Sequence, residues 1–146
     1  EKVLEQMDSN DKVIVWVANL HSNYDVASID YTNEVYVEDK MNERVESLGA
    51  LLQESDYSVY NAGLFHNEAD DYEILPEDYA TPRREKDETL EGYIGNRVQK
   101  DIFIDFATSD FIEEDQYTVY WAGYYDYRMV PQEQFDGLIY IDHIKK

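Results

Sequence analysis

The sequence predicts an α/β fold: a mostly parallel or mixed sheet of about five strands, flanked by helices in a three-layer sandwich. Largely apolar runs at residues 12–18, 57–65 and 101–106 are typical of strands buried on both faces. Segments with helical spacing of apolar residues, at 42–55 and 89–98, alternate with these runs, which favours parallel strands joined by helical crossovers. With 146 residues, the chain is long enough for a single α/β domain with its own core.

The first half is expected to begin with a helix at residues 1–10, whose apolar residues have helical spacing. The buried strand at 12–18 follows. A long polar loop then crosses the end of this strand and includes a short strand at 34–37, and loops of this kind often carry functional residues. The helix of 42–55 has its leucines on one face, and Gly49 allows close packing.

In the second half, residues 72–76 predict a short edge strand, because a proline blocks ladder pairing there. A charged linker at 81–87 precedes the helix of 89–98, whose first residue is a capping threonine. We expect one long aromatic strand at 117–129 and a last strand at 137–144. These last two strands are able to pair antiparallel.

The composition excludes several classes of function. Thirty-three acidic residues against twelve basic ones give a formal charge of −21, which repels nucleic acids and anionic membranes. Such a charge is typical of a solvated acidic surface, and it favours solubility, a cationic protein partner or a salty habitat. No apolar run is long enough to insert into a membrane. The absence of cysteine excludes disulfides and thiolate chemistry. Because the chain opens on Glu1 and no leader precedes the first strand, we expect either a processed product or part of a longer polypeptide, so that any targeting signal is lost from view.

Polar side chains follow each of the three buried strands. Asn19 and His21 end the first, His66 ends the second, and Asp105 lies at the end of the third. Ligands of open α/β sheets bind beyond the carboxyl ends of the strands, so these groups are expected to converge if the strands are neighbours. His21 is a candidate general base, or else a loop histidine bonded to backbone. Asn19 is expected to orient His21 or to bind a substrate carbonyl, or else to close a turn.

Three further residues are candidates for substrate binding: His66, Asp105 and Arg128. A carboxylate in the apolar surroundings of Asp105 needs a partner if it is buried, and Arg128 or Arg97 can supply one as a structural ion pair. His66 lies near several acidic residues, but their spacing is not that of a known metal site. We therefore expect no metal and no cofactor.

Several segments resemble, in the same order, those of the erythromycin esterase-like family. Trp-Val-Ala-Asn-Leu-His at 16–21 resembles the family's Trp-Ala-His-Asn-x-His segment, and Leu-Gly-Ala-Leu-Leu at 48–52 resembles its Met-Gly-x-x-Leu helix. Ile-Asp-Phe at 104–106 is similar to its Leu-Asp-Leu strand. Phe-Asp-Gly-Leu-Ile-Tyr-Ile at 135–141 is similar to its terminal Tyr-Asp-Gly-Leu-Ile-x-Ile pattern.

The resemblance implies hydrolysis of a small-molecule ester or lactone by activated water, with His21 and Asn19 lining the cleft. Two departures from the family pattern matter. Ala18 replaces the first histidine, and the family's N-terminal half, with its Gly-Glu-x-x-His segment, is missing. The resemblance therefore implies a C-terminal domain that is inactive alone. The alternative is a non-catalytic binding or protein-interaction module, which Ala18 and the acidic, tyrosine-rich composition favour.

Overall fold

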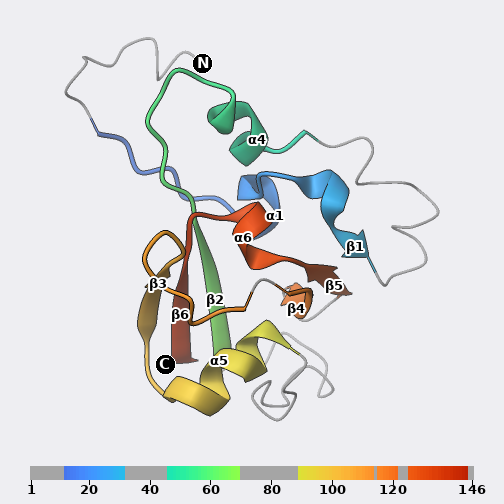
Figure 1. Cartoon of the computed structure of the whole chain (residues 1–146), viewed down its shortest axis with the longest axis vertical. Coiled ribbons are helices and arrows are strands. Elements are labelled where there is room, and N and C mark those ends of the chain that lie inside the picture. Colours follow the sequence, from blue (N-terminus) through green and yellow to red (C-terminus); the bar gives the residue numbers. More distant parts are fainter. Residues whose placement is uncertain (1–11, 32–45, 70–88, 114, 122–124, 145–146) are drawn as a thin grey trace.

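The computed structural model describes residues 12–31, 46–69, 89–113, 115–121 and 125–144 (Figure 1). Short helices and strands alternate along this part of the chain. In chain order the elements are α1 (Asn19–Ser22), the 3-10 helix η2 (Val26–Ser28), β1 (Asp30–Tyr31), α4 (Leu48–Gln53), β2 (Ala62–Ala69), α5 (Leu90–Val98), β3 (Ile102–Asp105), β4 (Tyr117–Trp121), β5 (Tyr125–Met129), α6 (Pro131–Gln134) and β6 (Gly137–Ile144).

The described strands form two three-stranded sheets. In the β6 sheet, with the order β2-β6-β3, β2 runs parallel to β6 and β3 runs antiparallel to it. In the β5 sheet, with the order β1-β5-β4, both pairs are antiparallel. The predicted α/β class with a mixed sheet is thus observed. The single sheet of about five strands is not, because the predicted strand at 117–129 is two antiparallel strands that pair with each other and leave the β6 sheet.

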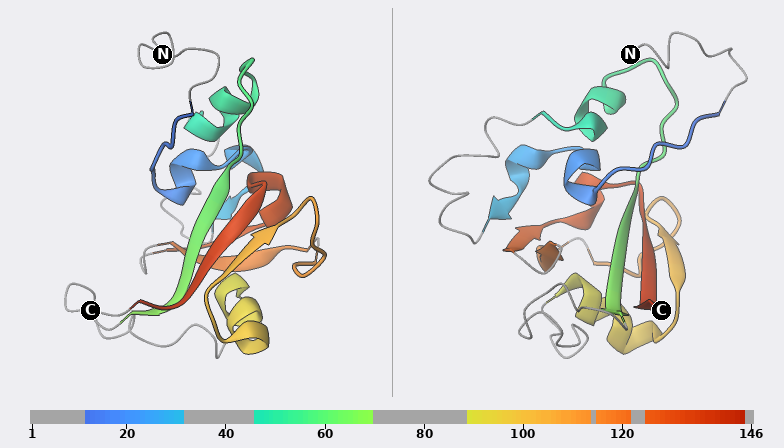
Figure 2. Two further views of the ribbon diagram at one scale, coloured as in Figure 1. Left: turned by 90° about the vertical axis from the view of Figure 1, so that its left-hand side faces the viewer. Right: turned by 180° about the vertical axis from the view of Figure 1, so that it is seen from behind.

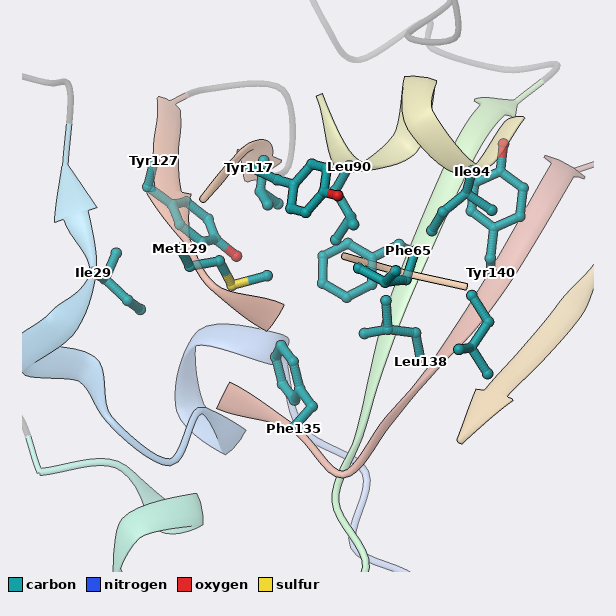
Figure 3. Packing of buried hydrophobic residues seen from close by; sticks show 13 residues of the cluster. Ile29, Phe65, Leu90, Ile94, Tyr117, Tyr127, Met129, Phe135, Leu138 and Tyr140 are labelled. Carbon is teal, nitrogen blue, oxygen red and sulfur yellow. The ribbon is translucent and has the colours of Figure 1, made fainter. Parts of the chain in front are cut away.

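One hydrophobic cluster joins the two sheets and α5 (Figure 3). The helix α5 is capped by Thr89, whose Oγ1 accepts a hydrogen bond from the Gly92 N–H at 3.0 Å. Leu90 and Ile94 are fully buried and belong to the same cluster as Phe65 of β2. Tyr127 and Met129 of β5 also belong to it, so the core lies between the two sheets and beneath α5.

The other face of the β6 sheet is open to solvent in the described part of the chain. Leu64 of β2 is 37% exposed and Phe103 of β3 is 58% exposed. Their neighbours in sequence, Phe65 and Ile104, are buried, because successive side chains of a strand point to opposite faces. Helix α5 thus covers one face only, and the three-layer sandwich is not what these residues form.

The prediction of a buried strand at residues 12–18 is wrong. These residues form neither helix nor strand, and Val13, Ile14, Val15 and Trp16 are all exposed. A strand buried on both faces needs neighbours on both sides. Within the described residues β2 has β6 on one side, and its other edge at Leu64 is occupied by the side chain of Asn19.

Other elements agree with the prediction to different degrees. Helix α5 and strand β6 match the segments 89–98 and 137–144 closely. Strand β2 begins at Ala62 rather than at residue 57, and α4 occupies only Leu48–Gln53 of the described part of its predicted helix. Strand β6 pairs with β2 and β3 rather than antiparallel with the strand that precedes it.

Four further predictions lie outside the described residues. They are the helix at 1–10, the short strand at 34–37, the edge strand at 72–76 and the linker at 81–87.

Candidate functional site

The helix α1, which carries Asn19 and His21, is fixed to the edge of β2. The Asn19 side chain donates from Nδ2 to the Leu64 carbonyl at 2.7 Å and accepts at Oδ1 from the Leu64 N–H at 2.9 Å. The amide thus takes the place of a neighbouring strand at one residue, which protects an open edge. At the other end of α1, the Ser22 carbonyl accepts a hydrogen bond from Asn61 Nδ2 at 2.5 Å. Asn19 therefore has a positioning role.

His21 lies in the last turn of α1 and is exposed. Its backbone N–H donates to the Ala18 carbonyl at 2.9 Å. Within the residues that the structure describes, the imidazole makes no hydrogen bond to protein. A general base needs a partner that orients it or takes over its proton. The arrangement therefore places His21 on a helix that is fixed to β2, but its exposed imidazole has no such partner among the described residues.

The predicted site residues are not all brought together. Asn19 contacts Leu64, and His66 follows two residues later on the same face of β2. Asp105 lies opposite Gly137 at the start of β6, whereas His66 lies opposite Ile141. These positions are four residues apart along β6, or about 13 Å. The expected convergence of His66 and Asp105 fails because β3 is antiparallel, which puts its carboxyl end at the opposite end of the sheet.

Arg128 does not belong to the same sheet as His66 and Asp105. It is exposed on β5, in the other sheet, opposite Asp30 of β1 and Thr118 of β4. Its expected pairing with Asp105 is not formed.

The carboxylate of Asp105 accepts hydrogen bonds from nearby neutral groups. Its partners are the Tyr60 hydroxyl at 3.2 Å, the Ala107 N–H at 3.1 Å and the Thr108 hydroxyl at 3.3 Å. Arg97, the other predicted partner, donates to the Tyr93 carbonyl at 3.0 Å and lies over the Tyr93 ring. The ion pair expected for Asp105 is therefore replaced by a turn that its own carboxylate closes.

Asp136 makes short polar contacts at this end of the sheet that were not predicted from the sequence. Its Oδ2 accepts from the Tyr24 hydroxyl at 2.5 Å and from the Asn61 N–H at 2.7 Å. The Asp136 carbonyl also lies 3.3 Å from the Tyr60 hydroxyl, which bonds Asp105. The Asp-Gly pair at the start of β6 was the available signal, because aspartate side chains commonly bond nearby backbone at such turns.

Gln134 strengthens the same junction from α6. It is fully buried, and its Oε1 accepts from the Asp25 N–H at 3.2 Å. Its Nε2 donates to the Asp25 carbonyl at 2.9 Å and to the Ser28 hydroxyl at 2.8 Å. Every polar group of this side chain thus has a partner, as burial requires. The segment that carries α1 is thereby tied to the chain just before β6.

Three tyrosines in the described residues hold their protons more tightly than usual. Burial, and next the hydrogen bond to Asp136, raises the pKa of Tyr24 well above 10.0. Burial and the bond to Asp105 raise the pKa of Tyr60 to about 12. Burial, and next the neighbouring Tyr93, raises the pKa of Tyr117 to about 12.

These shifts predict a loss of stability at alkaline pH. Above pH 10.0 the unfolded tyrosines lose their protons while the folded ones keep them. Their stabilising contribution is thus complete below pH 10.0 and is lost as the pH rises toward the folded pKa values. The expected slope is about 1.4 kcal/mol per pH unit for a buried tyrosine such as Tyr117. Denaturant unfolding at successive pH values measures it, and Tyr117→Phe should reduce the slope. A constant free energy of unfolding between pH 10.0 and about 12 would contradict the prediction.

The described residues offer neither a metal-binding cluster nor a membrane-spanning helix. No group of three or more histidine, aspartate and glutamate side chains there is arranged to hold a metal ion. Two of the acidic residues near His66 in sequence, Asp70 and Asp71, lie outside the described part. None of the described helices has the length and apolar character needed to cross a membrane.

No protein-family model, curated protein or solved structure matches this chain. The basis for assigning a function is therefore the chemistry of the site together with the short sequence resemblances.

Proposed function

We propose that this chain is the C-terminal domain of an erythromycin esterase-like hydrolase, in which His21 acts on a water molecule that attacks an ester or lactone. The observation that carries the proposal is the geometry of α1. The two hydrogen bonds between Asn19 and Leu64 fix this helix, and the His21 imidazole is open to solvent. An accessible imidazole on a fixed helix can accept a proton from a water molecule.

The site is incomplete in this chain. Ala18 cannot exchange a proton, and in the described part no carboxylate is bonded to the His21 imidazole. Activated-water hydrolysis needs a second group that shares the proton or stabilises the oxyanion. The proposal assigns this group to a Gly-Glu-x-x-His segment of a longer polypeptide, as the family resemblance implies.

The test is hydrolysis of short-chain esters and a macrolide lactone. We expect no turnover by the isolated chain and turnover by the longer polypeptide that contains it. In that polypeptide His21→Ala should lower kcat by about 10²–10⁴-fold, the usual contribution of a general base. The matched control is His143→Gln, which removes a histidine on β6, far along the sheet from α1.

Two results would contradict the proposal. Turnover by the isolated chain that His21→Ala abolishes would show that no second segment is needed. If the longer polypeptide with His21→Ala hydrolyses the substrates as fast as the unaltered one, His21 takes no part in the reaction.

The exposed apolar residues beside α1 favour a second function, that of a non-catalytic interaction module. Four consecutive apolar residues, at 13–16, are exposed next to α1, which is typical of a surface that binds another molecule. Equilibrium binding over a salt series separates two kinds of ligand. Binding of a cationic protein to this acidic chain weakens steeply with salt, whereas binding of an apolar small molecule does not.

A further inference from the structure

The segment before α1 has the character of a strand without a neighbour. We call residues 13–17, Val-Ile-Val-Trp-Val, the arm. It runs from α1 toward the periphery of the molecule without coiling (Figures 1 and 2). Among the described residues its backbone makes no hydrogen bond, and unpaired backbone groups in an extended apolar segment favour pairing with another chain.

The exposed fractions in the arm alternate. Ile14 is 91% and Trp16 is 79% exposed, whereas Val13 is 45% and Val15 is 52% exposed. Successive side chains of an extended segment point to opposite sides. The valine side of the arm is thus partly covered by its own chain, and the side with Ile14 and Trp16 faces solvent.

The charge distribution indicates what can approach the arm. The chain has 33 acidic residues and a net charge of −21, yet there is none from Lys12 to Tyr24, which is its longest stretch without an acidic residue. Two copies of this chain repel each other over most of their surfaces. Within the arm itself no carboxylate opposes the approach of a second copy.

The arm is also complementary to itself. If two arms pair antiparallel with Val15 opposite Val15, then Val13 lies opposite Val17 and Ile14 lies opposite Trp16. Cross-strand pairs of an aromatic and a β-branched residue stabilise a sheet by about 0.2–1 kcal/mol each. The arrangement is symmetric about a twofold axis, as in the commonest oligomers, homodimers.

We propose that the arm is a dimerisation strand, which pairs antiparallel with the arm of a second copy of this chain. The valine side of the resulting two-stranded ribbon rests on the two domains, and Ile14 and Trp16 of both copies pack together on the other side. An isolated two-stranded ribbon is only marginally stable. The dimer is therefore weak and forms with rising protein concentration.

The first experiment measures the molar mass by sedimentation equilibrium over a concentration series. The mass should rise from 17.3 kDa to twice that value as the protein concentration increases. Added salt should shift this rise to lower protein concentration, because salt screens the repulsion between two chains of charge −21. Ile14→Asp should abolish the dimer, and the monomer should stay folded because Ile14 is 91% exposed. Val15→Pro tests the backbone pairing by removing one N–H donor.

The matched control is Leu51→Asp. Leu51 is 49% exposed on α4, outside the arm, and this variant should dimerise like the unaltered chain.

A second experiment uses the absence of cysteine in the chain. In a Val15→Cys variant any disulfide must join two copies, and the twofold pairing places these residues opposite each other. Mild oxidation should give a covalent dimer faster than it does with Leu51→Cys. Equal rates for the two variants would overturn the proposal.

Other results would also overturn it. A mass of 17.3 kDa at every concentration excludes the dimer, and a dimer that survives Ile14→Asp lies elsewhere on the surface. Open-ended oligomers exclude twofold closure. Blue-shifted Trp16 fluorescence from a monomeric Trp121→Phe variant would show that the chain's own residues cover the arm. None of these readouts depends on hydrolysis, so the dimer and the proposed function can fail separately.

Discussion

Replacing Gly49 with alanine is expected to lower the free energy of unfolding by about 2–3 kcal/mol. A Cβ at this position would lie 1.8 Å from the Ser22 carbonyl oxygen and 2.6 Å from that of Asn23. Both atoms belong to the backbone, so α4 must move away from α1. In an exposed helix the same substitution would gain up to about 1 kcal/mol, because alanine favours helix. Because of the contact with α1, we expect Gly49→Ala to lower the free energy of unfolding rather than to raise it.

Chemical denaturation measures this loss. Ala50→Gly is the control on the same helix, and it should cost about 1 kcal/mol through helix propensity alone. A Gly49→Ala protein that is as stable as the unaltered chain would contradict the close packing of α4 on α1. Comparing the two variants separates the effect of the Gly49 contact on stability from the general preference of helices for alanine.

Asp136→Ala is expected to destabilise the protein by about 3 kcal/mol. The substitution leaves two donors without their acceptor, the Tyr24 hydroxyl and the Asn61 N–H. A hydrogen bond to a charged group contributes about 1.5–3 kcal/mol, and both donors are only partly buried, so water recovers some of the loss. The junction joins the segment after α1 to the starts of β2 and β6, which are far apart in sequence.

A double-mutant cycle with Tyr24→Phe isolates one of the two bonds. The double variant should be more stable than the sum of the single losses predicts, by about 1 kcal/mol or more. Asp110→Ala removes an exposed carboxylate and should change stability by less than about 0.5 kcal/mol. Additive losses in the cycle would contradict a direct contribution of the Tyr24–Asp136 bond.

The elements with strong local signals were predicted well from the sequence. Helix α5 has a capping threonine and apolar residues at helical spacing, and β6 is a largely apolar run that begins at the glycine of an Asp-Gly pair. These signals involve residues within one or two turns of each other, so no distant contact is needed to read them. The boundaries of β2 were predicted less well, because the residues at 57–61 are also compatible with a strand.

The candidate site could be predicted only in part. Asn19 and His21 do lie together beside β2, although the role of His21 stays a prediction. The link between Tyr24, Asn61 and Asp136 could not be predicted, because these residues are 37 and 75 positions apart along the chain, and no local pattern reports such a contact. The expected meeting of His66 with Asp105 depended on a strand direction that the sequence does not specify.

Composition and local patterns were enough to predict an acidic α/β chain, the positions of α5 and β6, and a glycine that allows close packing of its helix. These properties follow from composition, capping and periodicity, which act over short distances. The folded chain was needed to show that β3 runs antiparallel to β6, that β4 and β5 form a separate sheet with β1, and that the most apolar segment is exposed. Strand partners and burial depend on which distant segments meet, and their free energy is shared among all the elements of the fold.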